Sequence, residues 1–286
     1  MKIGVVGVGI VGGATAKVLG KTHELFLYDK FKSEYNSLEN LRKLAENCEA
    51  IFICVPTPMK TTGEIDYSSI HNSIEQLIEE LIKIERNPQE ILIIIRSTAV
   101  SGATDKLTYR YPFRFAFNPE FLREKCAVED MENIDRVIIG ANDEKSINQL
   151  LEIYKPIFPH AKYVIVTRKE AEMIKYAANV TLASQVVIAN EIYQICKTMG
   201  INYETIKNAV LLDSRIGRNI EVPGPDGDLG FGGKCFPKDL KALIRLSQEK
   251  EYDPYLLQEI WRTNERVRKN KDWLNITGAT AKNNYL

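Results

Sequence analysis

The sequence predicts an α/β protein in which a doubly wound, mostly parallel sheet is followed by an all-helical region built on one long spine helix. Three observations predict this fold class. Short apolar strands alternate with helical patterns over residues 1–166, as in sheets that carry helices on both faces. A glycine-rich turn follows the first strand, and a helical pattern without glycine or proline runs from residue 168 to 199. We therefore expect an α/β domain at residues 1–166, a helical domain at 167–274 and a frayed tail at 275–286.

The composition limits the classes of protein to consider. The chain has 286 residues, 44% of them hydrophobic, enough for one large or two smaller domains. Its 38 basic and 38 acidic residues give a net charge of +0, which indicates no general surface for nucleic acid or membrane. Five scattered cysteines without a CxxC pair and 3 histidines suggest neither a disulfide framework nor a metal site. Because no signal-peptide pattern or membrane-spanning run is present, we expect a reduced, soluble, cytoplasmic protein.

The start of the chain follows the pattern of a Rossmann dinucleotide-binding fingerprint. A β-branched strand at residues 2–6 leads into a glycine motif at residues 7–12. A helix follows at residues 14–19, and a second strand at residues 24–28 ends at Asp29. A glycine motif alone is weak, but here strand, turn, helix and acid occur in the required order. An acid at this position binds the adenosine ribose hydroxyls, which favours NAD over NADP.

The three glycines of the motif have separate roles. Gly7 permits the tight turn, Gly9 lets a pyrophosphate approach the helix N-terminus, and Gly12 allows close packing of helix on strand. The residues between the second and third glycines complete the expected pyrophosphate-binding turn; they are Ile10 and Val11.

The alternation of strands and helices continues through this domain. Apolar runs predict strands at residues 50–55, 91–95, 114–117, 136–140 and 163–166. Helices are expected at residues 67–84, where an apolar stripe faces the core, and at residues 144–154. Ligands bind at the carboxyl edge of such sheets, so the residues that follow the strands are candidates for binding.

Two strands end in turns of this kind. Pro56 and Pro58 break the strand at residues 50–55 and build a rigid turn around Thr57. Thr98 follows the strand at residues 91–95. It could hydrogen-bond a ligand or cap the following helix, and the spacing leaves both possibilities open.

Glu120 and Glu124 follow the strand at residues 114–117. Because they are four residues apart, the two acids share a face if this segment is helical. The spacing alone favours a solvated acidic face near Arg123 over a functional pair.

The helical pattern from residue 168 to 199 is long enough for a spine between domains or a dimer interface. Lys175 and Asn179 lie four residues apart and project from one face of it. Either could be an ordinary exposed polar residue. Shorter helices are expected at residues 203–212, after Asp239 to about residue 248, and at residues 254–274.

Residues 230–239 read Gly-Phe-Gly-Gly-Lys-Cys-Phe-Pro-Lys-Asp. Three glycines in four residues let a backbone approach a ligand closely. Cys235 follows them, and Pro237 suits the first turn of a helix. A thiol beside a cation and a helix N-terminus is biased toward the nucleophilic thiolate. The alternative is a glycine turn before a helix, with a small buried cysteine.

Together these motifs resemble the UDP-glucose/GDP-mannose dehydrogenase family over residues 1 to about 270. The matching motifs occur in the expected order at residues 7–12, 55–58, 97–98, 118–124, Lys175 with Asn179, 190–191, and 230–239. The Lys-Tyr-Ala-Ala-Asn sequence on the long helix is more similar to UDP-glucose members than to UDP-N-acetylmannosamine members.

The resemblance implies an NAD-dependent, four-electron oxidation of the C6 alcohol of UDP-glucose to UDP-glucuronate, with two NAD consumed. Cys235 adds to the intermediate aldehyde, and the thiohemiacetal is oxidised to a thioester that water hydrolyses. Alternatives are GDP-mannose or another sugar nucleotide, and a non-catalytic NAD-binding remnant. A β-hydroxyacid dehydrogenase is a further alternative, which Cys235 in its glycine frame argues against because such enzymes need no nucleophilic cysteine.

The resemblance also implies roles for single residues. Lys175 and Asn179 donate to the developing C6 oxyanion, and Lys175 assists removal of the alcohol proton. Glu120, Asp239 and Thr98 hold or activate the hydrolytic water. The implied NAD-binding residues are Gly7, Gly9, Ile10, Val11, Gly12, Asp29, Val55, Pro56, Thr57, Thr98, Glu124 and Lys238. The implied substrate-binding residues are Glu120, Phe121, Leu122, Arg123, Glu124, Lys175, Asn179, Arg215, Gly230, Phe231, Gly232 and Gly233.

Three further expectations follow from the resemblance. Arg215 reaches the substrate site of a neighbouring subunit, which implies a homodimer through the helical domain. The sequence ends at Leu286, so we expect a shortened form without the second Rossmann-like domain that covers the nucleotide. Residues 222–228 form a longer and more acidic loop than in many relatives, which is unexpected beside a diphosphate site.

Overall fold

The computed structural model describes residues 1–281 and divides the chain into two compact units. The first unit comprises Met1–Thr57 and Tyr67–Lys175, and the second comprises Pro58–Asp66 and Tyr176–Leu286. Within residues 1–281, no helix is long and apolar enough to cross a membrane. The expected domain limits at residues 166 and 274 stay a prediction.

The first unit is built on a seven-stranded sheet in the order β2-β1-β3-β4-β5-β6-β7. Neighbouring strands are parallel, except that β5 and β6 are antiparallel. The strands are β1 (Lys2–Val6), β2 (Glu24–Tyr28), β3 (Ala50–Ile53), β4 (Leu92–Ile95), β5 (Arg114–Phe117), β6 (Arg136–Gly140) and β7 (Lys162–Val166). The predicted doubly wound, mostly parallel sheet is confirmed.

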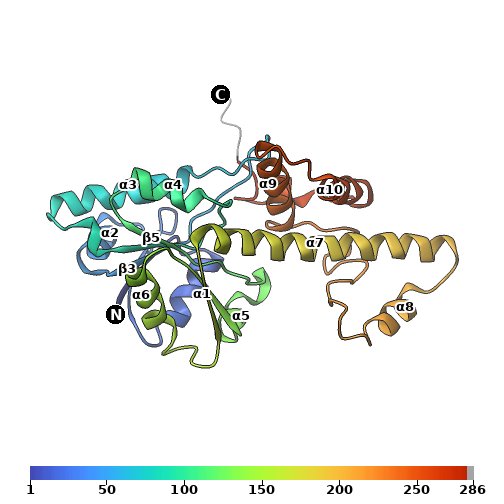
Figure 1. The fold of residues 1–286 in the computed structure, drawn as a ribbon, viewed down its shortest axis with the longest axis horizontal. Helices are drawn as coiled ribbons and strands as arrows, with labels where there is room; N and C mark the ends of the chain where they lie inside the picture. The colour runs from blue at the N-terminus through green and yellow to red at the C-terminus, as the bar shows by residue number, and fades with distance from the viewer. Residues whose placement is uncertain (282–286) are drawn as a thin grey trace. The chain divides into compact units, whose positions relative to one another are not determined.

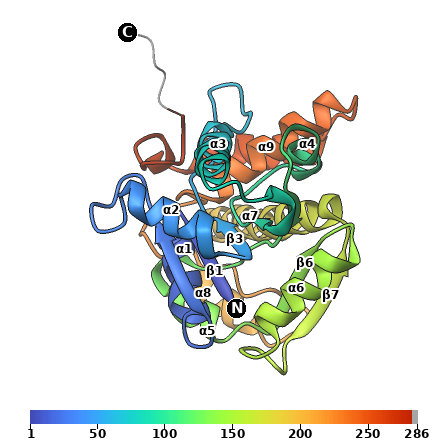
Figure 2. The same ribbon diagram turned by 90° about the vertical axis from the view of Figure 1, so that its left-hand side faces the viewer.

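Helices cover both faces of this sheet (Figures 1 and 2). The helices are α1 (Ile10–Leu19), α2 (Leu38–Asn47), α3 (Ser68–Lys83), α4 (Ala103–Arg110), α5 (Ala127–Glu132) and α6 (Glu144–Tyr154), with short 3-10 helices at Pro88–Glu90 and Glu124–Cys126. Alternate residues of a strand point to opposite faces. Ile51 and Ile53 of β3 therefore pack with α2, α3 and α4, whereas Ala50 and Phe52 pack with α1, α5 and α6.

The second unit is helical. It contains most of α7 (Arg168–Thr198), together with α8 (Tyr203–Val210), α9 (Phe236–Glu249), α10 (Tyr255–Val267) and a 3-10 helix at Asp272–Leu274. Its core joins α7 to α9, α10 and the glycine-rich loop through Val180, Ala183, Val187, Phe231, Leu240 and Ile260. The 31-residue helix α7 confirms the predicted spine.

Several element boundaries differ from the sequence-based expectation. Helix α9 begins at Phe236 rather than after Asp239, because Pro237 fits the first helical turn. Helix α10 ends at Val267 rather than at residue 274, because the next residue, Arg268, has an extended backbone conformation. Helix α2 was not expected, although Ser37 caps its first turn by accepting a hydrogen bond from the Asn40 amide at 3.0 Å.

A shared face for Glu120 and Glu124 requires the segment after β5 to be helical, and it is not. Residues 118–123 lie outside helices, and Glu124 begins the short 3-10 helix. The expectation of a frayed tail is wrong as far as residue 281. Ala279 is buried and accepts a hydrogen bond from the Met59 amide at 3.0 Å, while the Ala281 amide donates to the Met59 carbonyl at 2.7 Å. Residues 282–286 of that tail lie outside the described part.

Candidate active site

The glycine motif forms a tight turn with an open centre. A Cβ at Gly12 would lie 1.8 Å from the Gly7 carbonyl oxygen, and one at Gly7 would lie 2.9 Å from the Cys54 backbone. Gly7 also has a φ of +87°, which side chains rarely adopt. At Gly9, by contrast, a Cβ would meet no described atom within 4 Å. The first and third glycines thus close the turn, and the second leaves room at the N-terminus of α1.

Asp29 holds this turn in place. One of its carboxylate oxygens accepts a hydrogen bond from the Val8 amide at 2.7 Å. The other accepts from the amides of Phe31 at 2.8 Å and Lys32 at 3.1 Å. The acid at the end of β2 therefore fixes the glycine turn as well as standing at the edge of the neighbouring cavity.

That cavity measures about 230 Å³ and brings together residues predicted from separate motifs, Gly7, Asp29, Val55 and Pro56. Helix α3 adds four polar residues to the lining, Ser69, Asn72, Ser73 and Gln76. These four residues are not among those predicted from the sequence, where the apolar stripe of α3 indicates only a core helix. Their position on the polar side of the helix, away from its apolar stripe, is the signal that could have identified them.

The neighbouring strand ends are tied to each other. The Thr57 hydroxyl donates to the Thr98 carbonyl at 2.9 Å, and the Ser97 hydroxyl donates to the Val55 carbonyl at 2.6 Å. Thr98 does not cap the following helix, since the N-cap of α4 is Gly102. The carboxylate of Glu172 instead accepts from the amides of Gly102 at 2.5 Å and Thr104 at 2.8 Å. The capping role for Thr98 is therefore wrong, and its contact with a ligand stays a prediction.

A buried ion pair joins α7 to the segment after β5. The Lys175 ammonium lies 2.9 Å from a carboxylate oxygen of Glu120 and donates to the Glu120 carbonyl at 2.6 Å. The Leu122 amide donates to the second carboxylate oxygen at 2.8 Å. Burial would raise the pKa of Glu120, but the charge and hydrogen bond of Lys175 outweigh it, so this pKa is lowered.

The expectation of a solvated acidic face is therefore wrong for Glu120. The side chain of Glu120, which follows Pro119, is buried against Lys175. Glu124, by contrast, is exposed. Arg123 is exposed as well and pairs with Asp130 at 2.6 Å. The structure thus separates Glu120 from its two charged neighbours in the motif.

Four residues further along α7, Asn179 belongs to a second buried polar group. Its side-chain amide donates to one carboxylate oxygen of Asp239 at 2.5 Å, and the Lys238 ammonium donates to the other at 2.5 Å. All three side chains are buried, Asp239 with 1% of its surface exposed. Neither Lys175 nor Asn179 is the ordinary exposed residue that the sequence left possible, because each has a buried acidic partner.

Cys235 stands at the N-terminus of α9, the helix that carries Lys238 and Asp239. It is the N-cap residue of α9, and of the five cysteines, all in the described part of the chain, it is the exposed one. Burial raises the pKa of Cys48 and of Cys54 to about 12, which keeps both as thiols. A helix N-terminus favours the thiolate of an exposed cysteine. The alternative of a small buried cysteine is excluded.

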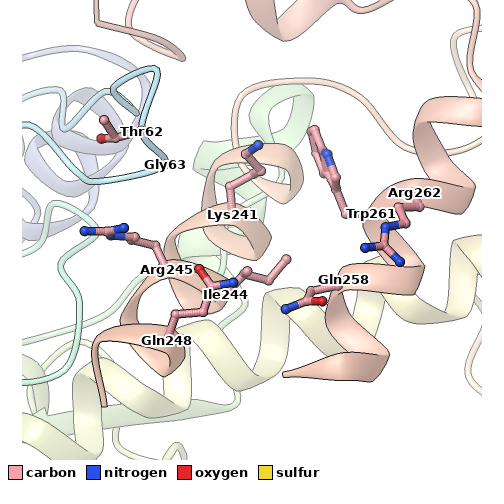
Figure 3. Close-up of a pocket in the computed structure, with 9 residues that line it drawn as sticks. All are labelled: Thr62, Gly63, Lys241, Ile244, Arg245, Gln248, Gln258, Trp261 and Arg262. Carbon is pink, nitrogen blue, oxygen red and sulfur yellow. The ribbon is translucent and has the colours of Figure 1, made fainter. Parts of the chain in front are cut away.

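A second cavity in this unit lies between α9 and α10 and measures about 340 Å³ (Figure 3). Lys241, Arg245, Arg262 and Trp261 line it. The Lys241 ammonium lies 4.9 Å from the centre of the Trp261 ring, and Arg245 pairs with Glu249 at 2.8 Å. None of the described residues that line this cavity is a predicted catalytic residue.

Arg215 follows α8 and is separate from these groups. It is exposed and pairs with Asp213 at 2.5 Å. Its reach into a neighbouring subunit stays a prediction.

The fold and the site define the class of protein. A doubly wound sheet with an open glycine turn and an acid at the end of the second strand is the architecture of dinucleotide-binding proteins. Residues 24–158 match the NAD binding domain of the UDP-glucose/GDP-mannose dehydrogenase family, and residues 169–266 match the central domain of that family. The chain belongs to this family and contains its NAD-binding and central domains.

Curated relatives and solved structures agree with this membership. The chain is 36% identical over 247 residues to a UDP-glucose 6-dehydrogenase of Rickettsia felis, covering 84% of this chain and 52% of the relative. It is 35% identical to a UDP-glucose 6-dehydrogenase of Bacillus subtilis, over 77% of this chain and 47% of the relative. A UDP-glucose dehydrogenase structure from Pyrobaculum islandicum matches with a TM-score of 0.80 and 29% identity, over 93% of this chain and 68% of that one. The chain spans about half the length of these curated relatives.

Proposed function

We propose that this chain carries out the NAD-dependent, four-electron oxidation of UDP-glucose to UDP-glucuronate through a covalent intermediate on Cys235. The observation that carries the proposal is an exposed cysteine at the N-terminus of α9, whose first turn carries the buried Lys238 and Asp239 that contact Asn179 of α7. The names of the 36% identical relatives support UDP-glucose as the substrate.

The cavity at the glycine turn fits the cofactor. Gly9 offers space beside the N-terminus of α1, and Asp29 and the polar side of α3 line the place for an adenosine ribose. NAD, when bound, accepts one hydride from C6 in each of the two oxidations.

In the first oxidation the C6 alcohol loses a hydride and a proton. Lys175 in its neutral form takes up the alcohol proton. The resulting ammonium is then paired with the Glu120 carboxylate, which lies 2.9 Å away and stays ionised. The product of this step is the C6 aldehyde.

In the second oxidation the Cys235 thiolate attacks the aldehyde carbon, and an S–C6 bond forms. The carbonyl electrons move to oxygen, and Asn179 and protonated Lys175 donate to the resulting oxyanion. Loss of a second hydride from C6 converts the adduct to a thioester.

Hydrolysis completes the reaction. Water attacks the thioester carbon, the S–C6 bond breaks, and the Cys235 thiolate leaves. Glu120 and Asp239, with Thr98, hold this water and accept its proton. The uronate carboxylate then carries the oxygen that came from water.

We further propose a homodimer that forms through the helical unit. Ile188, Ile192 and Ile195 of α7 form one exposed apolar stripe that continues to Met199 directly after the helix, and each has more than 40% of its surface exposed. An apolar patch of this kind marks a protein interface, and a stripe that packs on its own copy suits a two-fold axis. A cytoplasmic location stays a prediction.

The test of the substrate is a side-by-side turnover assay. The purified chain is mixed with NAD and either UDP-glucose or GDP-mannose, and NADH is followed by absorbance. We expect turnover with UDP-glucose. Turnover with GDP-mannose but not with UDP-glucose would show that the substrate assignment is wrong. Binding of NAD without turnover of either sugar nucleotide would support the non-catalytic alternative.

A further inference from the structure

The acidic loop at residues 222–228 has a definite partner in the segment that follows α10. The side chain of Arg268 has 1% of its surface exposed. One of its terminal nitrogens donates to Asp226 at 2.6 Å and to Asp272 at 3.1 Å. Burial works to lower the pKa of Arg268, but the two carboxylates outweigh it and the pKa is raised. The loop therefore supplies counter-charge to a buried guanidinium.

A second acid fastens the same two segments through the backbone. One carboxylate oxygen of Asp228 accepts from the amides of Lys269 at 3.1 Å and Asn270 at 2.7 Å. Its other oxygen accepts from the Leu229 amide at 2.8 Å. Both acids of the loop thus face the residues after α10, which explains why an acidic loop is stable at this place in the chain.

The same ion pairs contact the glycine-rich loop. The Gly233 amide donates to the second carboxylate oxygen of Asp272 at 3.0 Å. A Cβ at Gly232 would lie 2.1 Å from the Arg268 guanidinium and 2.3 Å from Asp272. The loop backbone therefore lies directly against the charged pair, and Gly232 is needed for that close approach.

Phe231, which precedes Gly232, is held by hydrogen bonds from a residue of α10. The Phe231 amide donates to the side-chain oxygen of Asn264 at 2.7 Å, and the Asn264 nitrogen donates to the Phe231 carbonyl at 3.0 Å. Phe231 in turn packs edge-on to Phe236 in the first turn of α9, with ring centres 6.1 Å apart. The loop is thereby fixed on both sides of Gly232, two to four residues before Cys235.

We propose that Asp226, Arg268 and Asp272, here termed the Arg268 clamp, are positioning residues that place Cys235 for attack on the aldehyde. This inference rests on the proposed function. The clamp acts through the backbone of Gly232 and Gly233 and does not touch the reacting atoms. It therefore matters for the thioester half of the reaction, whereas the first hydride transfer needs no thiol.

The experiment is a single turnover with enzyme in excess over UDP-glucose, followed by NADH absorbance after rapid mixing. In Asp272→Ala we expect the first NADH to form at the wild-type rate and the second to form about tenfold more slowly, or slower still. Asp226→Asn removes one charge from the more exposed end of the clamp and is expected to give a smaller slowing of the same phase. The Asp226→Asn variant also provides the test of the Arg268 clamp if Asp272→Ala fails to fold. The matched control is Glu259→Gln, which removes an exposed partner of Arg262 on α10 and should change neither phase.

Loss of amplitude in both phases together would indicate only destabilisation of the fold, and it would overturn the positioning role. Unchanged second phases in folded Asp272→Ala and Asp226→Asn would overturn it too. A wild-type chain that forms no NADH with UDP-glucose contradicts the proposed function instead. The clamp is then tested by hydrogen exchange, with faster exchange of the amides of residues 230–233 in Asp272→Ala as the supporting result and unchanged exchange as the contrary one.

Discussion

Lys175 and Glu120 form a buried ion pair at 2.9 Å between residues that are 55 positions apart in the chain. The pair links α7 to the segment after β5 inside the first unit. Removal of one partner of a buried pair leaves an uncompensated charge, which is costly where both side chains are buried.

The pair predicts a large stability loss for a change at one partner. We expect Glu120→Ala to lower the free energy of unfolding by about 3 kcal/mol, measured by urea denaturation at pH 7. The matched control is Glu132→Gln, which breaks the exposed pair with Lys21 and should have no measurable effect. Equal effects of the two changes would contradict a structural role of the buried pair.

The glycine turn predicts a separation between folding and cofactor binding. Gly9→Ala should leave the melting temperature unchanged, because its Cβ meets no atom of the described chain within 4 Å, yet it should weaken NAD binding about tenfold by filling the space for the pyrophosphate. In Gly13→Ala the Cβ would lie 3.8 Å from the Val8 carbonyl, and both properties should be kept. Calorimetric titration with NAD measures the difference, and equal affinities in the two variants would speak against a pyrophosphate at Gly9.

Glu172 predicts a pH dependence of stability. Burial raises the pKa of Glu172 to about 7 from its ordinary value of 4.5, although the hydrogen bonds from Thr104 and Gly102 act to lower it. A raised pKa in the folded state means that the folded chain binds more protons than the unfolded chain between these two values. The stability contributed by the protonated acid is therefore present below pH 4.5 and is lost as the pH rises through 7.

The variant that tests this pH dependence is Glu172→Gln, because glutamine cannot titrate. We expect the wild-type chain to lose about 3 kcal/mol more than this variant between pH 4.5 and pH 7. Urea denaturation at several pH values gives both profiles. Parallel profiles would show that Glu172 keeps the same charge in both states.

The apolar stripe on α7 predicts the state of assembly. Ile188→Glu combined with Ile195→Glu should convert a dimer into a monomer, because two charges would be buried at the interface. Light scattering after size exclusion measures the mass. The control Ile82→Glu changes an exposed isoleucine of α3 in the first unit and should leave the mass unchanged. A wild-type monomer, or a dimer that survives both charges, would rule out this face.

The sheet and the spine helix could be predicted from the sequence because each depends on local patterns. Strand alternation, the glycine turn with Asp29, and the uninterrupted α7 all appear within short windows of the chain. The boundary at Pro237 also had a local signal, since proline suits the first turn of a helix.

The burial of the site residues could not be predicted in this way. Glu120 is buried by a lysine 55 residues away, and Asp239 meets an asparagine 60 residues away. Spacing within one segment carries no information about such partners. The acidic loop was unexplained for the same reason, because Arg268 lies 42 residues after Asp226.

The most direct test of the account is the yield of NADH and uronate in Cys235→Ala, beside Cys196→Ala and the wild-type chain. With UDP-glucose and NAD, wild type and Cys196→Ala should form about two NADH for each uronate. Cys235→Ala should form no uronate while it still binds NAD. Uronate formation by Cys235→Ala at the wild-type rate would contradict a thioester on this cysteine.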